Sequence, residues 1–332
     1  MSGHHRLLVT GGRGLLGNAV IAAATAQGWS VTALQRNASG MADRADVTDV
    51  LGSVTDPACV QRALAGCDAV IHLAARVGID GRWSDFEKVN VGGTRVVVDA
   101  ARRAGVGSFV HVSSPSVAHA GRALVGADAA AADPQSARGH YSRSKAIAEQ
   151  YVLSVDDIPV VALRPHLVWG PGDEQLVGRI VSRARSGRLF VIDGGRALID
   201  TTYIDNAADA IVHAVGRTSN AQVRGRAFVI SNGEPRPVRE IVAAIVQAAG
   251  IDEPMRSVPF APAFAAGAVG EWVGVLTRRE PLVTRFLVEQ LATAHWFDPR
   301  PTWSALDWKP RVSVEQGMRK LAEYFSRGEI LD

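Results

Sequence analysis

The first half of the chain alternates short apolar runs with stretches of helical periodicity. The apolar runs lie at residues 6–10, 29–36, 50–54, 68–75, 105–114 and 158–165. Runs of this length, bounded by turn residues, are typical of strands buried in a parallel sheet. Strand and helix in regular succession predict an α/β fold of the Rossmann type, a doubly wound parallel sheet with right-handed crossovers.

A glycine-rich turn follows the first strand. The segment RLLVTGGRGLLG at residues 6–17 passes from the strand through the turn into a helix. Glycines at this spacing allow a sharp turn, a close approach by a pyrophosphate and tight packing of the helix on the sheet. The free N–H groups of the helix start then face the phosphates. We expect a dinucleotide site here, with an ordinary tight turn as the alternative. The expected contacts are Gly11, Gly14, Leu15, Leu16 and Gly17.

The end of the second strand indicates which dinucleotide is preferred. An acid normally holds the ribose 2′-hydroxyl of NAD at this point, but this chain has Gln35 and Arg36. A guanidinium can hold a 2′-phosphate by two hydrogen bonds, and Arg13 in the glycine turn could reach the same phosphate. The pattern predicts NADP. NAD remains the alternative if both arginines are merely solvated.

Two further segments are candidates for contact with the adenosine half of the cofactor. Ser53 and Val54 follow the third strand and are expected at the adenine edge. Leu73, Ala74 and Ala75 end the fourth strand, where small apolar residues leave room for the ligand.

Beyond residue 165 the alternation loosens into mixed helices punctuated by Pro and Gly. We therefore expect a dinucleotide-binding Rossmann domain over residues 1–168 and a mainly substrate-binding lobe over 169–332. Segments near 198–231 are expected to return to the first domain.

Tyr141 and Lys145 stand four residues apart at a predicted helix start. At this spacing both side chains share one face of a helix. The chain has four tyrosines and four lysines, so about 0.05 such pairs are expected by chance. A nearby ammonium favours the phenolate and is expected to lower the phenol pKa. The pair predicts a tuned acid. The alternative is an exposed tyrosine beside a solvated lysine.

Composition excludes several other classes of function. The 332 residues are 47% hydrophobic, and 36 basic against 33 acidic residues leave a formal charge of +3 without a basic stripe. Nucleic-acid binding is not indicated, and neither is a metal site, because Cys59 and Cys67 belong to no ligand cluster. The start shows no signal peptide, so a cytoplasmic protein is expected. The apolar run at 260–276 fits a packed helix better than a membrane span, with peripheral membrane contact left open.

Together these segments resemble the extended short-chain dehydrogenase/reductase superfamily. The glycine turn, NVGGT around Asn90, Ser114, the Tyr141 and Lys145 pair and RPHLVWGPGD at 164–173 follow the order of that family. Within it, the segments LRPHLVWGPGDEQLV and ALIDTTYIDNAADA are similar to the 3β-hydroxysteroid dehydrogenase branch. The greatest similarity is to bacterial 2-alkyl-3-oxoalkanoate reductases and to sterol-4α-carboxylate 3-dehydrogenases.

The resemblance implies a mechanism and roles for particular residues. Tyr141 would give a proton to a carbonyl oxygen, Ser114 would hold that oxygen, and Lys145 would tune the phenol and bind the ribose. Pro165 and Val168 join the expected cofactor contacts. The implied enzyme reduces a 3-oxo group on a hydrophobic substrate with a neighbouring carboxylate. The apolar helix at 260–276 would serve as its lid. A homodimer through 84–103 and 140–155 is implied by the same analogy.

Two other functions are kept as alternatives. A sugar-nucleotide epimerase or dehydratase needs an arginine for the diphosphate, and the matching position here is Ile199, with Arg196 nearby. A protein that only senses NADP would need no catalytic acid.

Several polar and aromatic residues have two readings. Asn90 either organises a water for proton supply or bonds to a bent helix, and His166 either lines the nicotinamide or substrate site or is structural. Trp169 and Tyr203 either wall the pocket or belong to the core. His72 and His111 are expected to be packed in their strands.

Overall fold

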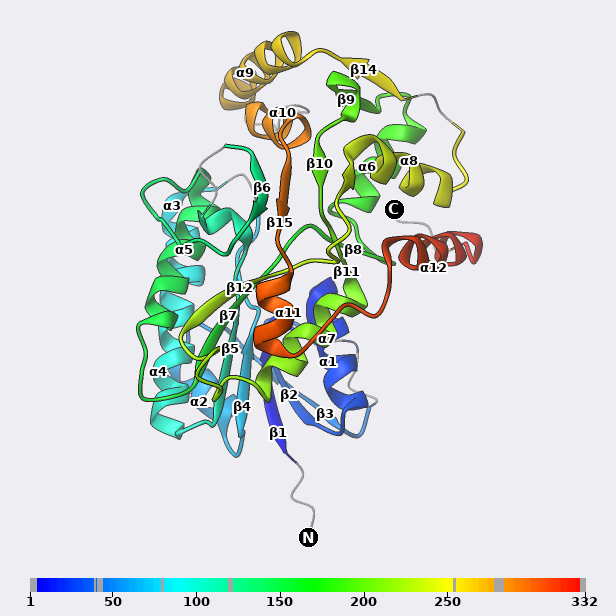
Figure 1. Ribbon diagram of the computed structural model, residues 1–332. Coiled ribbons are helices and arrows are strands. Elements are labelled where there is room, and N and C mark those ends of the chain that lie inside the picture. The colour runs from blue at the N-terminus through cyan, green and yellow to red at the C-terminus, as the bar shows by residue number, and fades with distance from the viewer. Residues whose placement is uncertain are drawn as a thin grey trace.

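A seven-stranded parallel sheet forms the base of the molecule (Figure 1). The computed structural model describes residues 5–38, 40, 44–78, 81–118, 122–252, 255–277 and 284–328. The strands lie in the order β12-β7-β5-β4-β1-β2-β3. Their bounds are β1 Arg6–Thr10, β2 Ser30–Gln35, β3 Val47–Leu51, β4 Ala69–His72, β5 Ser108–Val112, β7 Val160–Pro165 and β12 Arg226–Ile230.

The predicted doubly wound α/β fold is confirmed. Strand β1 pairs in parallel with β2 on one side and with β4 on the other, so the winding direction reverses between β1 and β4. The predicted third strand at 50–54 is wrong in position, because β3 spans Val47–Leu51. Strand β3 lies at the sheet edge with only Val47 buried, so its start carries little apolar signal.

Helices cover both faces of this sheet. Alternate strand residues enter two cores, as Leu7 and Leu8 of β1 do. One core also contains residues of α1, α7 and α11, and the other contains residues of α2, α4 and α5. Their bounds are α1 Leu15–Ala26, α7 Ile204–Val215, α11 Arg300–Leu306, α2 Pro57–Leu64, α4 Thr94–Ala104 and α5 Gly139–Leu153. Between β4 and α4 lie α3 (Trp83–Phe86) and a π-helix, η1 (Glu87–Gly93).

A second group of elements lies beyond the carboxyl ends of the large sheet (Figure 1). It contains a four-stranded sheet in the order β13-β10-β15-β6 and two strand pairs, β11-β8 and β14-β9. The strands are β6 Leu124–Ala127, β8 Val168–Trp169, β9 Phe190–Ile192, β10 Leu198–Ile199, β11 Thr202–Tyr203, β13 Arg236–Pro237, β14 Arg256–Val258 and β15 His295–Phe297. The helices are α6 Val177–Arg185, α8 Val238–Ala248, α9 Phe260–Thr277, α10 Arg285–Ala292 and α12 Val314–Ser326, with 3₁₀ turns η2 Pro115–Ala118 and η3 Asp193–Gly195. The boundaries expected for the two domains stay a prediction.

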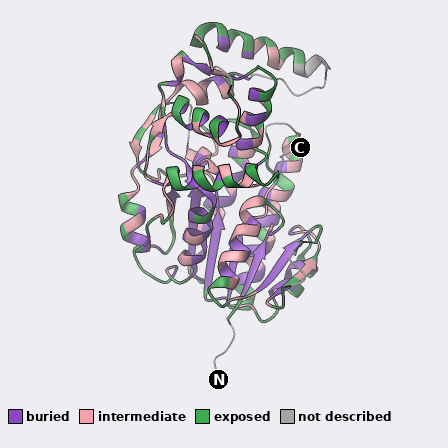
Figure 2. Cartoon of the chain, turned by 90° about the vertical axis from the view of Figure 1, so that its right-hand side faces the viewer, coloured by how far each residue is buried: buried purple, intermediate pink, exposed green. Residues whose placement is uncertain are grey.

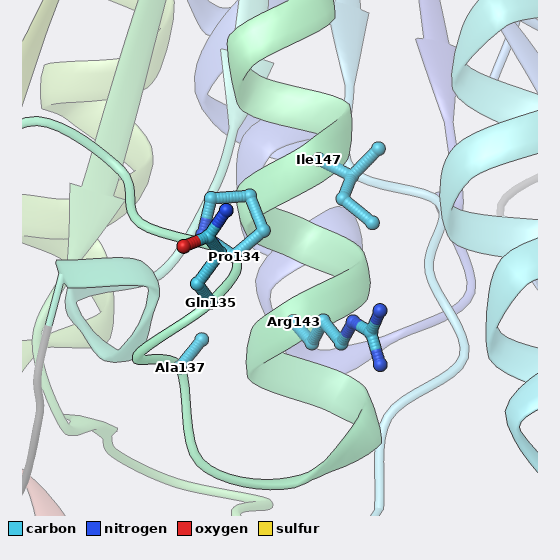
Figure 3. A pocket seen from close by; sticks show the side chains of 5 residues that line it. All are labelled: Pro134, Gln135, Ala137, Arg143 and Ile147. Atoms are coloured by element: carbon cyan, nitrogen blue, oxygen red, sulfur yellow. The ribbon is translucent and has the colours of Figure 1, made fainter.

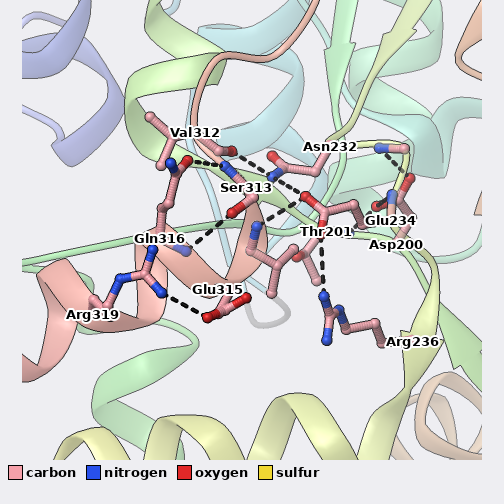
Figure 4. A network of polar contacts seen from close by, with 12 residues as sticks. Asp200, Thr201, Asn232, Glu234, Arg236, Val312, Ser313, Glu315, Gln316 and Arg319 are labelled. Carbon is pink, nitrogen blue, oxygen red and sulfur yellow. Dashed lines mark hydrogen bonds and ion pairs between the residues drawn. The ribbon is translucent and has the colours of Figure 1, made fainter.

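A buried polar network ties distant segments of this upper part together (Figure 4). The fully buried Asp200 carboxylate accepts hydrogen bonds from the backbone N–H groups of Thr201, Gly233 and Glu234. Burial nevertheless raises the pKa of Asp200. Asn232 donates to the carbonyl of Val312 at 2.9 Å. The loop after β12 is thereby joined to both the β10 region and the start of α12.

Burial follows the layers, with the large sheet inside and exposed helix faces outside (Figure 2). The helix predicted from the apolar run at 260–276 is present as α9, at the far end of the upper part. Phe260, Val269, Trp272 and Val273 on this helix are exposed. Among the described residues, no helix combines the length and apolar character that crossing a bilayer demands.

The close packing of α1 against the glycine turn leads to the first prediction. A Cβ at Gly17 would collide with the Gly11 carbonyl oxygen and lie 2.8 Å from the Gly12 Cα. We expect Gly17→Ala to lower the free energy of unfolding by about 1–3 kcal/mol, as overpacking does. Chemical denaturation measures this change. Gly107→Ala is the control, because its Cβ would meet only the Asp68 carbonyl oxygen at 3.7 Å. Equal stability of the two variants would contradict the prediction.

Candidate functional site

The glycine turn lies against the end of β4. Gly11 has φ +76°, its N–H donates to Leu34, and a Cβ there would lie 2.9 Å from the Ala74 backbone. Thr10 links the two strand ends, because its carbonyl accepts from Leu73 and its hydroxyl accepts from the Ala74 N–H. The structure therefore brings together the turn and the apolar segment that were predicted separately.

The start of α1 fits a phosphate. Gly14 is the N-cap residue and makes no side-chain cap, and the first turn of the helix contains no acid. A Cβ at Gly14 would meet only the Gly11 carbonyl oxygen, at 3.6 Å, so the space beside it is open. Exposed N–H groups beside an open glycine surface are the features that a pyrophosphate requires.

Arg13 of the glycine turn reaches the residues that follow β2, where Arg36 lies. Both arginines are exposed. The Asn37 side chain accepts from the Arg13 guanidinium at 2.8 Å and donates to the Arg36 backbone carbonyl at 3.2 Å. Gln35 is buried and donates to Asp49 at 2.8 Å, so it points under the turn. The groups available to a ligand at this corner are guanidinium groups.

The two residues expected at the adenine edge have different surroundings. Ser53 bonds to the Thr55 hydroxyl at 2.8 Å and accepts from the Thr55 N–H. Val54 is buried in the core, and a Cβ at Gly93 would lie 2.8 Å from it. Ser53 therefore belongs to the turn after β3, and Val54 packs that turn against η1.

Helix α5 presents Tyr141 near the end of β5, where Ser114 lies. A hydrogen bond with Ser114 lowers the pKa of Tyr141, but burial outweighs it and raises that pKa to about 12. The expected lowering of the phenol pKa by Lys145 is therefore wrong for this structure. The sequence spacing placed the two residues on one face but did not reveal that loss of solvent around the phenol outweighs its hydrogen bond.

The Lys145 ammonium is buried against strand β5. Its side chain donates to the Val112 carbonyl at 2.6 Å and lies 3.4 Å from Nε2 of His111. Burial lowers its pKa to about 8, while Glu149 acts in the opposite direction. Since an ammonium has three donors, these two contacts leave one N–H for a further acceptor.

The two strand histidines lie behind Lys145 and are packed, as expected. Thr94 donates its hydroxyl proton to the Asn90 carbonyl, so it accepts from Nε2 of His72, whose Nδ1 accepts from Thr10. Burial and the Lys145 charge lower the pKa of His72 to about 3 and that of His111 well below its usual value. Both imidazoles are neutral at physiological pH.

Asn90 joins the loop after β4 to helix α5. Its oxygen accepts from the Arg76 N–H at 2.6 Å, and its nitrogen donates to the Arg76 carbonyl and to Ser144. Ser144 in turn donates to the Tyr141 carbonyl at 2.7 Å. Both amide hydrogens are thus engaged by protein. These contacts favour a structural role for Asn90, because they join the loop after β4 to α5 from within the π-helix η1.

His166 follows the end of β7 and is buried against the upper part. Its Nε2 lies 3.1 Å from Nδ1 of His295, and its ring meets Phe297 edge-on at 5.2 Å. Pro165 pairs with β12, whereas Val168 pairs with β11. Trp169 and Tyr203 pack edge-to-face in the upper core, so they are core residues.

A pocket lies beside α5 and the loop that precedes it (Figure 3). It is lined by Pro134, Gln135, Ala137, Arg143 and Ile147. Arg143 and Ile147 stand two residues after Tyr141 and Lys145, which is about 200° around an α-helix. Arg143 stacks over Trp83 with its guanidinium carbon 4.8 Å from the ring centre. This hollow is part of the surface for which the dimer was predicted, and the dimer stays a prediction.

The position relevant to a sugar diphosphate is apolar. Ile199 is buried on β10 between β13 and β15. Arg196 is exposed in the loop after η3. The position that an arginine would occupy in a sugar-nucleotide enzyme is therefore an apolar side chain, that of Ile199.

Sequence reasoning missed a buried ion pair between Arg164 and Glu149, which lies on the face of α5 that carries Tyr141 and Lys145. The available signal was the spacing of Tyr141, Lys145 and Glu149 by four residues each, together with an arginine inside the apolar run VVALRP.

Known proteins match nearly the whole chain. The family model described as 3-beta hydroxysteroid dehydrogenase/isomerase matches residues 8–260. The 2-alkyl-3-oxoalkanoate reductase of Stenotrophomonas maltophilia is 41% identical, over 95% of this chain and 98% of that protein. The decarboxylating sterol-4-alpha-carboxylate 3-dehydrogenase of Saccharomyces cerevisiae is 31% identical, over 83% of this chain and 82% of that protein.

A solved structure shows the same fold in a more distant protein. A dTDP-glucose 4,6-dehydratase double mutant from Streptomyces venezuelae, with NAD bound, has a TM-score of 0.76 at 22% identity, covering 98% of each chain. The superfamily and branch indicated by the sequence motifs are confirmed, and the protein is an oxidoreductase of the extended short-chain type. The chain belongs to the 3-beta hydroxysteroid dehydrogenase/isomerase family.

Proposed function

We propose that this protein is an NADP-preferring reductase that interconverts a 3-oxo group and a 3-hydroxyl on a hydrophobic, carboxylate-bearing substrate. The substrate class is that in the name of the Stenotrophomonas relative, a 2-alkyl-3-oxoalkanoate. The observation that carries the proposal is the convergence of Ser114, Tyr141 and Lys145 at the carboxyl ends of the strands, on the edge that also carries the glycine turn.

The reductive direction suits the protonation states at this site. A nicotinamide held along this edge supplies the hydride. With a pKa of about 12, Tyr141 retains its proton at neutral pH and can donate it to the carbonyl oxygen. Ser114 holds that oxygen by a hydrogen bond as negative charge develops. The third N–H of the Lys145 ammonium would bind a ribose hydroxyl of the cofactor.

The cofactor contacts proposed are those of the glycine turn and the two strand ends. Gly11, Gly14 and Gly17 with the start of α1 would hold the pyrophosphate. Arg13 and Arg36 would hold the 2′-phosphate. Ser53, Leu73, Ala74 and Ala75 would contact the adenosine, and Pro165 and Val168 the nicotinamide half. The buried Ile199 argues against a sugar-nucleotide substrate, because the position that would hold a diphosphate carries no guanidinium, although Arg196 and Arg236 lie near it.

Replacing the proposed acid tests the mechanism directly. We expect Tyr141→Phe to lower kcat for reduction of a 2-alkyl-3-oxo acid by about 10²-fold or more. NADPH affinity, measured by fluorescence titration, should be retained. Tyr151→Phe is a matched control on the same helix, since its hydroxyl bonds to Asp99 at 2.6 Å. Wild-type turnover in the Tyr141 variant would refute the role.

Cofactor choice is tested at the end of β2. Arg36→Asp removes a charge-assisted partner of the 2′-phosphate and adds a carboxylate suited to the NAD ribose. We expect NADPH affinity to fall by about 10- to 100-fold, the equivalent of about 1.5–3 kcal/mol, while NADH affinity holds or improves. Arg103→Asp on α4 is the control and should change neither the NADPH affinity nor the NADH affinity. Equal losses with both cofactors would contradict contact with the 2′-phosphate.

The pH dependence follows from the low pKa of Lys145. Below about pH 8 this group is an ammonium, and above that pH it becomes neutral. Tyr141 stays protonated throughout this range. We therefore expect kcat/KM for NADPH, which reports the free enzyme, to fall as pH rises above about 8. A profile that stays flat to pH 10 would show that the ammonium is not required.

A further inference from the structure

A buried ion pair continues the face of α5 that carries Tyr141 and Lys145. Glu149 is four residues beyond Lys145 and fully buried, and Arg164 on β7 is 1% exposed. Nε of Arg164 donates to one carboxylate oxygen at 2.9 Å, and Nη2 donates to the other at 2.5 Å. Nη1 donates to the Ala130 carbonyl at 2.7 Å. The pair therefore joins the catalytic helix, the sheet and the loop that leads into the helix.

Stability alone is a poor reason for such a pair. Removing two charges from water carries a large desolvation cost, and an apolar pair of similar volume often stabilises a protein equally well. An ordinary pair is available for comparison in Arg102 and Asp157, where Nε contacts both carboxylate oxygens at 2.9 and 2.8 Å while both side chains are over 40% exposed. The buried pair differs because its carboxylate stands one helical turn beyond Lys145, in a medium that screens charge weakly.

Glu149 brings a negative charge to the surroundings of Lys145, whereas the imidazoles and the phenol near the lysine are neutral. On β5 the neutral His111 lies 3.4 Å from the ammonium, and on β4 the neutral His72 lies behind it. On the same helix Tyr141 is uncharged at neutral pH. Glu149 opposes the loss of the lysine proton, and both of its oxygens accept N–H groups from Arg164, as a carboxylate does.

We propose that Glu149, anchored by Arg164, is a positioning residue that keeps Lys145 in its ammonium form and holds α5 in register with β7. This inference rests on the proposed function, since it assigns the ammonium a task in cofactor binding and reduction. It extends the reaction centre by one helical turn, to residues that touch neither substrate nor cofactor.

The test compares variants that keep or remove the carboxylate charge. Glu149→Asp retains the charge with a shorter side chain, and Glu149→Gln removes it. The double variant Glu149→Gln, Arg164→Met removes both charges, so that no guanidinium is left buried alone. Arg102→Met is the surface control. NADPH affinity is titrated by fluorescence from pH 6 to 10, kcat/KM for NADPH is measured over the same range, and each variant's thermal unfolding is followed in parallel.

We expect the alkaline fall in NADPH affinity and in kcat/KM to move to lower pH in Glu149→Gln, by about one pH unit, the usual effect of a neighbouring opposite charge. The double variant should regain thermal stability and keep the displaced profile. Glu149→Asp should retain the wild-type profile even if its melting temperature falls. Arg102→Met should match the wild type in every measurement.

The outcomes separate this inference from the proposed function. A wild-type profile in the double variant, or the same displacement in Glu149→Asp as in Glu149→Gln, would overturn the role of Glu149. If the wild-type affinity for NADPH shows no alkaline fall at all, the task assigned to the Lys145 ammonium fails, and the inference fails with it. Turnover that survives in Tyr141→Phe would refute the catalytic proposal while the binding profiles still report on the ion pair.

Discussion

The hydrogen bond from Lys145 to the Val112 carbonyl is the interaction on which the site depends. It is 2.6 Å long and joins helix α5 to the end of a central strand. Parallel strands end at one edge, so this bond holds α5 at the edge that also carries the glycine turn. Burying an ammonium is unfavourable unless it is satisfied; the Val112 carbonyl and His111 contact it, and Glu149 one turn along α5 favours its charged form.

Burial determines the chemistry of the phenol in this structure. Proximity to an ammonium lowers the pKa of a phenol, whereas loss of solvent raises it, and for Tyr141 loss of solvent has the larger effect. A proton held firmly at neutral pH suits an acid that acts on a carbonyl. In the oxidative direction the same residue would accept the hydroxyl proton, so it would first have to lose its own.

The upper part of the molecule is attached by polar contacts with strict geometry. Asp200 collects three backbone N–H groups, and Asn206 and Asn232 bind the chain at Val312. His166 meets His295 between β7 and β15, where the large sheet and the smaller sheet approach each other. Such contacts tolerate little displacement, so they fix the position of the upper part of the molecule above the strand ends.

The sequence by itself determined the parallel α/β fold, the glycine turn and the Tyr141 and Lys145 pair, because these depend on local periodicity and spacing. It missed the bounds of β3, an exposed edge strand with little apolar signal, and it gave the wrong direction for the Tyr141 pKa. Only the tertiary structure showed that Asn90 clamps Arg76 and Ser144, that Gln35 turns inward to leave Arg13 and Arg36 at the ligand corner, and that Arg164 meets Glu149. Solvent exposure and contacts between residues distant in the chain are properties of the packed molecule, so no local pattern encodes them.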